Sequence, residues 1–210
     1  MNDKILGILI PYYKNSEQSK YAFQQLMAKL NKQVNENMIL YVYEDGQYSS
    51  WLRNFKNKNI IVESNFINKG VSYARNKGID YLINKVRYIL FIDSDDDVSD
   101  DYLSVILDHC MDNTHEVIES TFYVNDQKAS FNPKVVRSGV AGSAIQTKII
   151  GDIRFNEELQ IAEDTTFMNT VIDLTKHRKV HAKTNYIYQF GINQNSLIMR
   201  YNRKEIKEER

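Results

Sequence analysis

The chain has 210 residues, which is enough for one domain with a sizeable core, or for one domain with a small appendage. Its 27 basic and 27 acidic side chains give a formal net charge of zero, which argues against broad electrostatic binding to nucleic acid or to an anionic membrane. No stretch approaches the roughly 20 apolar residues of a membrane span, and the amino-terminal apolar run is too short for a signal peptide.

Cys110 is the only cysteine, which excludes an internal disulfide and a thiolate metal cluster. Its place among apolar residues at helical spacing predicts a packing role. A reducing compartment is the simplest setting for such a chain, so we expect a cytoplasmic location.

The first hundred residues alternate between patterns typical of buried strands and of amphipathic helices. The strand-like segments are continuous apolar runs, and they cover residues 5–10, 38–43, 59–62 and 87–92. The helical segments have apolar residues at helical spacing, and they cover 16–30, with Ser16 as a possible N-cap, and 71–82. This order predicts an α/β fold with a mainly parallel sheet, right-handed crossovers and flanking helices.

The second half of the chain has a smaller and more mixed pattern. Helices are expected at 102–111 and 162–174, and strands at 116–124, 128–136 and 180–190. A turn around Asn125–Asp126 would join the first two of these strands, and Gly139–Gly142 has the composition of a loose segment. The charged tail at 199–210 is expected to be solvated. No repeat or low-complexity linker interrupts the chain, so a single domain over 1–198 fits best.

The densest signal is the string FIDSDDD at 91–97, where an apolar run ends abruptly in four aspartates. Like charges this close repel each other, so they need a cation or wide solvation. A simpler explanation is that the acids begin the next helix, where negative charge suits the amino terminus. That explanation fits Asp100 and Asp101 well, but it fits Asp93 poorly because Asp93 directly follows the last apolar position.

Turn-forming residues also follow the first two predicted strands, at Pro11–Tyr13 and Glu44–Gly46. The carboxyl ends of parallel strands meet at one edge of a sheet, and ligands of open α/β folds bind there. Tyr13 could stack on a base and Asp45 could accept a hydrogen bond from one. Arg75 follows nearby, on the helix predicted at 71–82, and could meet phosphate or base.

Five strings in order resemble the family-2 glycosyltransferases with the GT-A fold. They are ILIPYY, YEDG, NKGVSYARNKGID, FIDSDDD and the segment IRFNEELQIAEDTTF at 153–167. The resemblance covers about residues 4–196, and it implies a nucleotide-binding half at 1–97 and an acceptor-side half at 98–198. The chain departs from the family strings at Glu44, where an aspartate is usual, at Gln47, where a serine is usual, and at Tyr12, where a threonine is common.

The resemblance implies a donor site for a nucleoside-diphosphate sugar, with a UDP-sugar expected. By the family pattern, Pro11, Tyr13 and Asp45 would face the base, Arg75 would lie near the nucleotide, and Asp93 would lie near the ribose.

The same resemblance implies a metal and a catalytic base. Asp95, with Asp96, would bind Mn²⁺ or Mg²⁺ against the diphosphate, and His181 is a candidate for the extra histidine ligand of some relatives. Asp164 would deprotonate the acceptor hydroxyl, with Glu163 beside it, in an inverting transfer. Oxygen ligands suit both metals, and a hydroxyl nucleophile needs a positioned base. The acceptor would be a glycan, a polymer or a protein hydroxyl, and nucleic acid is not expected.

Two other functions remain open from the residues alone. A nucleotidyltransferase also combines a parallel sheet, a metal and a nucleotide, although its first loop would be glycine-rich and basic. A catalytically inactive sugar-nucleotide or glycan-binding module is the other alternative. Four residues also have structural alternatives: Arg75 could pair with Asp80, Tyr13 could serve packing, and the Glu163–Asp164 pair could simply begin a helix.

Overall fold

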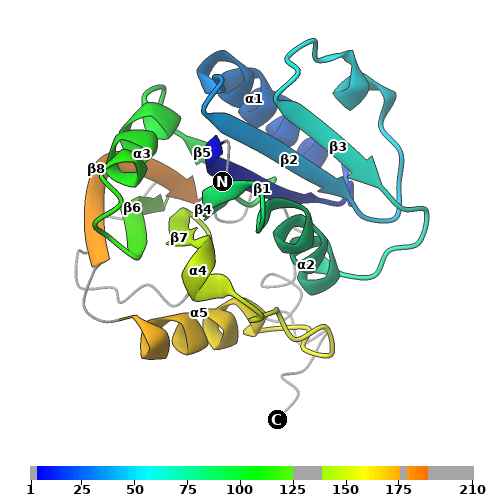
Figure 1. Ribbon diagram of the computed structural model, residues 1–210. Coiled ribbons are helices and arrows are strands. Elements are labelled where there is room, and N and C mark those ends of the chain that lie inside the picture. The colour runs from blue at the N-terminus through cyan, green and yellow to red at the C-terminus, as the bar shows by residue number, and fades with distance from the viewer. Residues whose placement is uncertain (1–3, 125–138, 176–178, 189–210) are drawn as a thin grey trace.

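The computed structural model describes residues 4–124, 139–175 and 179–188, which form one eight-stranded sheet with helices on both faces (Figure 1). The strands are β1 (Lys4–Tyr12), β2 (Met38–Glu44), β3 (Ile60–Ser64), β4 (Val86–Phe91), β5 (Asp97–Val98), β6 (Val117–Val124), β7 (Ser143–Gln146) and β8 (Lys179–Tyr188). The helices are α1 (Glu17–Gln33), α2 (Val71–Leu82), α3 (Tyr102–Met111), α4 (Thr147–Ile150) and α5 (Glu163–Leu174), with a short 3₁₀ helix η1 (Ser50–Asn54). The sheet order is β3-β2-β1-β4-β7-β6-β8-β5.

Strands β3, β2, β1 and β4 pair in parallel, which confirms the parallel sheet predicted for the first half of the chain. Their apolar runs are buried because helices cover both faces of the sheet. In the register, Leu9 of β1 is opposite both Tyr41 of β2 and Phe91 of β4, so these strands end at one edge. The residues that follow β1, β2 and β4 therefore gather at that edge.

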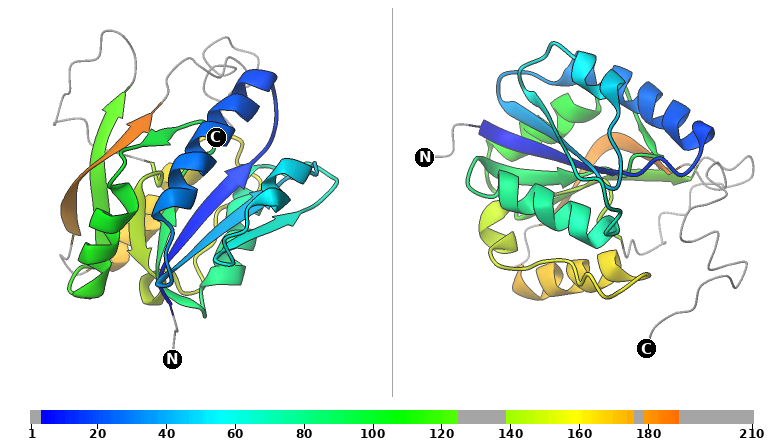
Figure 2. Two further views of the ribbon diagram at one scale, coloured as in Figure 1. Left: turned by 90° about the horizontal axis from the view of Figure 1, so that it is seen from above. Right: turned by 90° about the vertical axis from the view of Figure 1, so that its right-hand side faces the viewer.

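The two faces of the sheet carry separate apolar cores. Helices α1 and α3 cover one face, and α2, α4 and α5 cover the other. The right-hand view of Figure 2 shows the sheet between α1 above and α2 with α5 below. Ser16 caps α1 through a capping box with Ser19, as the sequence suggested. Cys110 is buried in the first core, in the packing role predicted for it.

The second half contains a strand that the sequence did not reveal. Strand β7 lies between β4 and β6 and runs antiparallel to both, directly after the segment that looked loose. It has four residues, all buried, which is too short for a periodic pattern to appear. The expected strand at 128–136, its turn at Asn125–Asp126 and the tail at 199–210 lie outside the described residues. Within the described part of the chain, no helix combines the length and apolar character needed to cross a membrane.

Candidate functional site

The end of β4 and the start of α5 bring acidic side chains from both halves of the chain together. Asp93, Asp95 and Asp96 lie in the loop that follows β4, whereas Glu163 and Asp164 form the first turn of α5. We call Asp93, Asp95, Asp96, Glu163 and Asp164 the carboxylate edge. A tertiary contact between sequence segments about 70 residues apart therefore builds the candidate site.

Arg75 joins the two parts of the carboxylate edge. Its side chain extends from the buried face of α2, and one terminal nitrogen donates to Asp93 Oδ1 at 2.9 Å while the other donates to Glu163 Oε1 at 2.9 Å. The residue is only 3% exposed, and its guanidinium carbon lies 5.2 Å from the centre of the Phe155 ring. Arg75 thus binds carboxylates of the protein itself, and its place near a nucleotide stays a prediction.

The suggested pairing of Arg75 with Asp80 is wrong. Asp80 lies on the exposed side of α2, and its Oδ1 accepts from Arg154 Nε at 2.9 Å. Three-residue and four-residue spacings bring helix side chains together, but five residues place Asp80 away from Arg75.

Burial and charge shift the pKa values of this ion-paired group in opposite ways. Burial alone would lower the pKa of Arg75, but the nearby carboxylates of Asp93 and Glu163 raise it above the ordinary value. Burial raises the pKa of Glu163, and the neighbouring charge of Asp164 adds to this, against the lowering effect of Arg75. The guanidinium therefore stays charged, while ionisation of Glu163 is costlier than in water.

The aspartates between β4 and α3 have different partners. Asp96 is buried, and its Oδ2 accepts a hydrogen bond from the Tyr186 hydroxyl at 2.6 Å. Asp97 pairs with Lys29 of α1 at 2.7 Å, so it connects the loop after β4 to a helix on the face of the sheet opposite α5. Asp101 precedes α3 and accepts from the Ser99 and Thr184 hydroxyls at 2.7 and 3.0 Å. Asp101 is therefore structural, as its position before a helix suggested.

Two tyrosines of β8 belong to the site and were missed from the sequence. The Tyr186 hydroxyl accepts from the Asp93 backbone N–H at 3.0 Å and donates to Asp96, so it fixes the turn after β4. Tyr188 lies near enough to four carboxylates that burial and the charges of Asp96, Asp95, Asp93 and Asp164 raise its pKa to about 12. Neither tyrosine lies in a motif, and a chain with 14 of them offers no signal that singles them out.

Asp164 has a different environment from its neighbour Glu163. Its Oδ1 accepts the Thr165 backbone N–H at 2.7 Å, and its side chain is half-buried. Its Oδ2 lies so close to Gly139 that a Cβ at that position would come within 2.6 Å. The preceding residue, Ala162, has a left-handed φ of 64°, which is uncommon for alanine and turns the chain sharply into α5. The sharp turn places two adjacent acids in separate surroundings.

Asp45, which directly follows β2, fixes the loop that leads into α2. Its carboxylate accepts the backbone N–H groups of Lys69 and Gly70, at 2.9 and 2.7 Å to Oδ2, and the Asn65 side-chain amide at 2.9 Å. Gly46 has a φ of 76°, and a side chain there would meet the Asn68 backbone at 2.7 Å. The glycine that the turn requires is thus also needed for the close approach of this loop.

The expected base-facing residues lie near this loop. Tyr13 follows β1 directly and is 47% exposed, so its ring is available for stacking. Pro11 lies one position before the end of β1 and pairs in register with Tyr43. The contacts of these residues with a base stay predictions.

Two departures from the family strings have structural partners. Glu44 is buried and forms an ion pair with Arg53 of η1, whose guanidinium lies 4.0 Å from the centre of the Tyr48 ring. Gln47 accepts the Lys14 backbone N–H at 2.9 Å, so it connects the loops after β1 and β2. The longer side chains at these positions therefore secure neighbouring segments.

His181 is placed apart from the carboxylate edge. Its backbone lies in the first half of β8, opposite Glu119, five residues before Tyr186. At roughly 3.3 Å per strand residue, this separation is on the order of 15 Å along the strand. The backbone of His181 thus lies apart from Tyr186, whose hydroxyl binds Asp96, and the role of His181 as a ligand stays a prediction.

A parallel half-sheet that ends in aspartates, joined to a mixed half that adds a Glu-Asp pair, defines a transferase domain of the GT-A class. The family model "Glycosyl transferase family 2" matches residues 8–180, so the chain belongs to that family. This finding confirms the resemblance carried by the five strings.

Individual relatives agree with the family. The chain is 24% identical over 229 residues to "Minor teichoic acid biosynthesis protein GgaA" of Bacillus subtilis (strain 168), which covers 95% of this chain and 51% of that protein. The chain therefore spans about half the length of this curated relative. Crystal structures of S. aureus TarS 1-349 share the fold, with a TM-score of 0.73, 18% identity and coverage of 88% of this chain and 60% of that chain. The structure of TarS 1-349 in complex with UDP-GlcNAc has a TM-score of 0.71 and 19% identity, and the match covers 89% of this chain and 59% of that chain.

Proposed function

We propose that this chain is the catalytic domain of a glycosyltransferase that moves a sugar from a UDP-sugar to a hydroxyl group of a teichoic-acid-type polymer, with inversion at the anomeric carbon. The observation that carries the proposal is the carboxylate edge, where Arg75 joins Asp93 of the nucleotide half to Glu163, the neighbour of Asp164, of the acceptor half. Family membership and the name of the B. subtilis relative support the reaction class and the acceptor.

The donor end of the site supports a nucleotide. The half-exposed ring of Tyr13 offers a stacking surface at the end of β1, and the TarS relative of the same fold was crystallised with UDP-GlcNAc. Asp45 keeps the adjoining loop in shape through its backbone contacts. This loop geometry would form one wall of the base site.

A divalent metal would bind at this site together with the diphosphate. Among the described residues, no three His, Cys, Asp or Glu side chains are grouped as a ready-made metal site. Mg²⁺ in nucleotide enzymes is held by one or two carboxylates plus substrate phosphates, and Asp95 with Asp96 could provide that number. When bound, Mg²⁺ or Mn²⁺ would neutralise charge on the departing diphosphate.

Asp164 is the better candidate for the general base of the two acids in α5. The Glu163 carboxylate is committed to Arg75, whereas Asp164 is half-buried and receives one backbone hydrogen bond at Oδ1. In the proposed reaction, the oxygen of the acceptor hydroxyl attacks the anomeric carbon, and Asp164 takes the hydroxyl proton. The bond between the anomeric carbon and the UDP oxygen breaks, and UDP leaves. Such a base commonly contributes about 10²–10⁴-fold in rate.

The proposal is tested by sugar transfer from UDP-GlcNAc and UDP-glucose to a poly(glycerol phosphate) acceptor in the presence of Mn²⁺. We expect Asp164→Asn to keep UDP binding and to lose transfer by about 10²-fold or more. Asp173→Asn, on the exposed end of the same helix, is the matched control and should transfer normally. Normal transfer by Asp164→Asn would remove this residue from the mechanism.

The metal assignment has a separate test. Asp95→Asn should weaken UDP binding in the presence of Mn²⁺ and leave metal-free binding nearly unchanged, whereas the exposed control Asp100→Asn should change neither.

In the transfer assay, release of pyrophosphate would favour the nucleotidyltransferase instead. Donor binding without turnover for any acceptor would favour the inactive module.

A further inference from the structure

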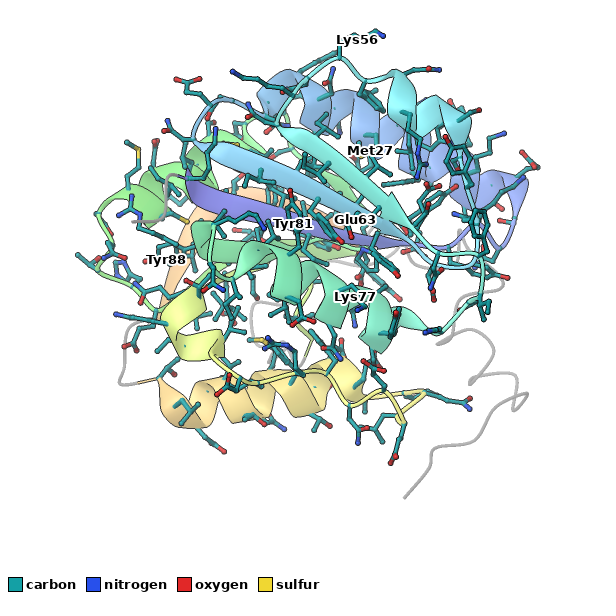
Figure 3. The ribbon with its side chains drawn as sticks, turned by 45° about the vertical axis from the view of Figure 1, so that its right-hand side comes forward. Met27, Lys56, Glu63, Lys77, Tyr81 and Tyr88 are labelled. Carbon is teal, nitrogen blue, oxygen red and sulfur yellow. The ribbon has the colours of Figure 1, made fainter. Side chains whose placement is uncertain are left out.

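The exposed side of α2 carries a regular alternation of lysine and tyrosine. At steps of four residues the chain places Lys69, Tyr73, Lys77, Tyr81 and Lys85, which we call the lysine–tyrosine stripe. Tyr73, Lys77 and Tyr81 are neighbours on the surface of α2, whereas Lys69 precedes the helix and Lys85 follows it. Contacts between the lysines and the tyrosine rings join the five side chains into one row. All three lysines are exposed, and Figure 3 shows Lys77 and Tyr81 along the same helix.

The tyrosine rings hold the lysine ammonium groups in place. Lys69 Nζ lies 4.5 Å and Lys77 Nζ 5.4 Å from the centre of the Tyr73 ring, so two cations flank one ring. Lys85 Nζ lies 3.8 Å from the centre of the Tyr81 ring. Cations held this way lose less side-chain freedom when they bind an anion, which strengthens binding.

The rings themselves are anchored to the sheet. Tyr73 packs edge-on against Tyr43 with centroids 6.0 Å apart, and Tyr81 stacks on Tyr41 at 4.6 Å. Tyr73 and Tyr81 are eight residues apart, which is about 12 Å along a helix axis. The stripe is therefore a fixed row of positive points and not a set of independent surface lysines.

The acids beside the stripe have partners of their own. Glu63, which Figure 3 shows close to Tyr81, accepts the Tyr41 hydroxyl at 2.8 Å. Asp80, three residues from Lys77, is paired with Arg154 at 2.8 Å. Tyr41 is neutral and leaves the charge of Glu63 in place, but the three lysines outnumber this one acid, so the stripe keeps an excess of positive charge on a chain whose formal net charge is zero.

The stripe also has a defined position relative to the carboxylate edge. Arg75, on the inner side of the same helix, binds Asp93 and Glu163, and the Lys69 backbone binds Asp45 at the end of β2. The row therefore begins beside the Asp45 loop, on the same sheet edge as Asp93, and leads away from it along α2. An extended ligand on the stripe could reach the reaction site with one of its units.

We propose that the lysine–tyrosine stripe is an acceptor-binding track that takes successive phosphates of a phosphate-linked polymer. The inference rests on the proposed function for the identity of the acceptor, because a teichoic-acid-type chain carries one negative charge per repeat. Repeated phosphates match a row of fixed cations better than they match a single pocket. The rings are packed against the sheet and cannot insert into a bilayer, so we favour a polymer over a membrane surface, although Phe66 and Ile67 are exposed nearby.

The test compares Lys77→Gln/Lys85→Gln with the matched control Lys56→Gln/Lys58→Gln, which removes the same charge from an exposed loop away from α2 (Figure 3). Binding of a fluorescent poly(glycerol phosphate) chain is measured by anisotropy over a range of salt. We expect the stripe variant to bind about fivefold to tenfold more weakly at low salt, and the control to bind within a factor of about two of the unmodified chain.

Transfer assays give a second measurement. For the long polymer, the stripe variant should raise KM by a similar factor and leave kcat unchanged, whereas a single-repeat acceptor should react equally with all three proteins. Equal binding by the stripe variant and the unmodified chain would overturn the inference. So would binding to phosphatidylglycerol vesicles without binding to the polymer. Absence of transfer by the unmodified chain, with stripe-dependent polymer binding intact, would instead count against the proposed function alone.

Discussion

At the scale of single residues, the site depends on small distances around two adjacent acids. Glu163 and Asp164 are neighbours in sequence, yet one is paired with Arg75 and the other lies against Gly139. The left-handed Ala162 makes this divergence possible by turning the backbone before α5. Burial raises the pKa of Glu163, and its ion pair with Arg75 suits a positioning role, whereas Asp164, the proposed base, forms no such ion pair with any residue that the structure describes.

Gly139→Ala tests how closely Asp164 is positioned. A Cβ there would come 2.6 Å from Asp164 Oδ2, so the carboxylate would have to move. We expect sugar transfer to fall by about tenfold to a hundredfold, because small displacements of a catalytic group are costly. In an Asp164→Asn background the same change should cause no further loss, and an equal loss there would place the effect elsewhere.

A pH prediction follows from Glu163. Its pKa is raised in the folded chain, chiefly by burial, so the folded state keeps this proton to higher pH than the unfolded state does. The stability that the group provides is full below the ordinary glutamate pKa and is lost as pH rises toward the raised value.

Urea unfolding at pH values from about 4 to 7 measures this effect. We expect the free energy of unfolding to include a component that declines with pH, which Glu163→Gln removes and the exposed control Glu158→Gln retains. Identical pH slopes in the three proteins would show that Glu163 titrates normally.

At the scale of elements, α2 connects three parts of the site. Its inner side provides Arg75, its outer side carries the lysine–tyrosine stripe, and its entry loop is held by Asp45. Its bounds, 71–82, are those that apolar spacing predicted. The spacing could not show that a loop carboxylate from β2 fixes the start of the helix, because that contact joins segments more than 20 residues apart.

Asp45→Asn tests this loop anchor. The amide keeps the size of the side chain but loses the charge that strengthens hydrogen bonds to the Lys69 and Gly70 N–H groups. We expect faster hydrogen exchange at these two amides and a loss of about 1–2 kcal/mol in stability. Asp152→Asn, at an exposed position, is the control. Unchanged protection of both amides would mean that other contacts hold the loop.

At the scale of the whole molecule, Arg75 connects the parallel first half of the chain to its mixed second half. It binds Asp93 after β4 and Glu163 at the start of α5, and it lies over Phe155, which stacks on Phe167 with ring centroids 4.0 Å apart. The buried guanidinium of Arg75 binds both carboxylates and packs on the aromatic pair. It therefore fixes the position of Asp93 relative to Glu163.

Arg75→Met measures the strength of this connection. Removing the buried cation leaves two carboxylates without their partner, so we expect a loss of about 3–5 kcal/mol in the free energy of unfolding by urea. Arg154→Met breaks the exposed pair with Asp80 and should cost no more than about 1 kcal/mol. Similar losses in both variants would show that the bridge contributes no more than a surface pair.

The sequence by itself determined the parallel half-sheet, the bounds of α2 and the gathering of Tyr13, Asp45 and Asp93 at one edge. Those features follow from apolar runs and from the rule that parallel strands end on the same side. The short strand β7, the tyrosines of β8 and the Arg75 bridge were decided only by the tertiary structure. Each depends on contacts between segments far apart in the chain, and local periodicity carries no information about which distant side chains meet.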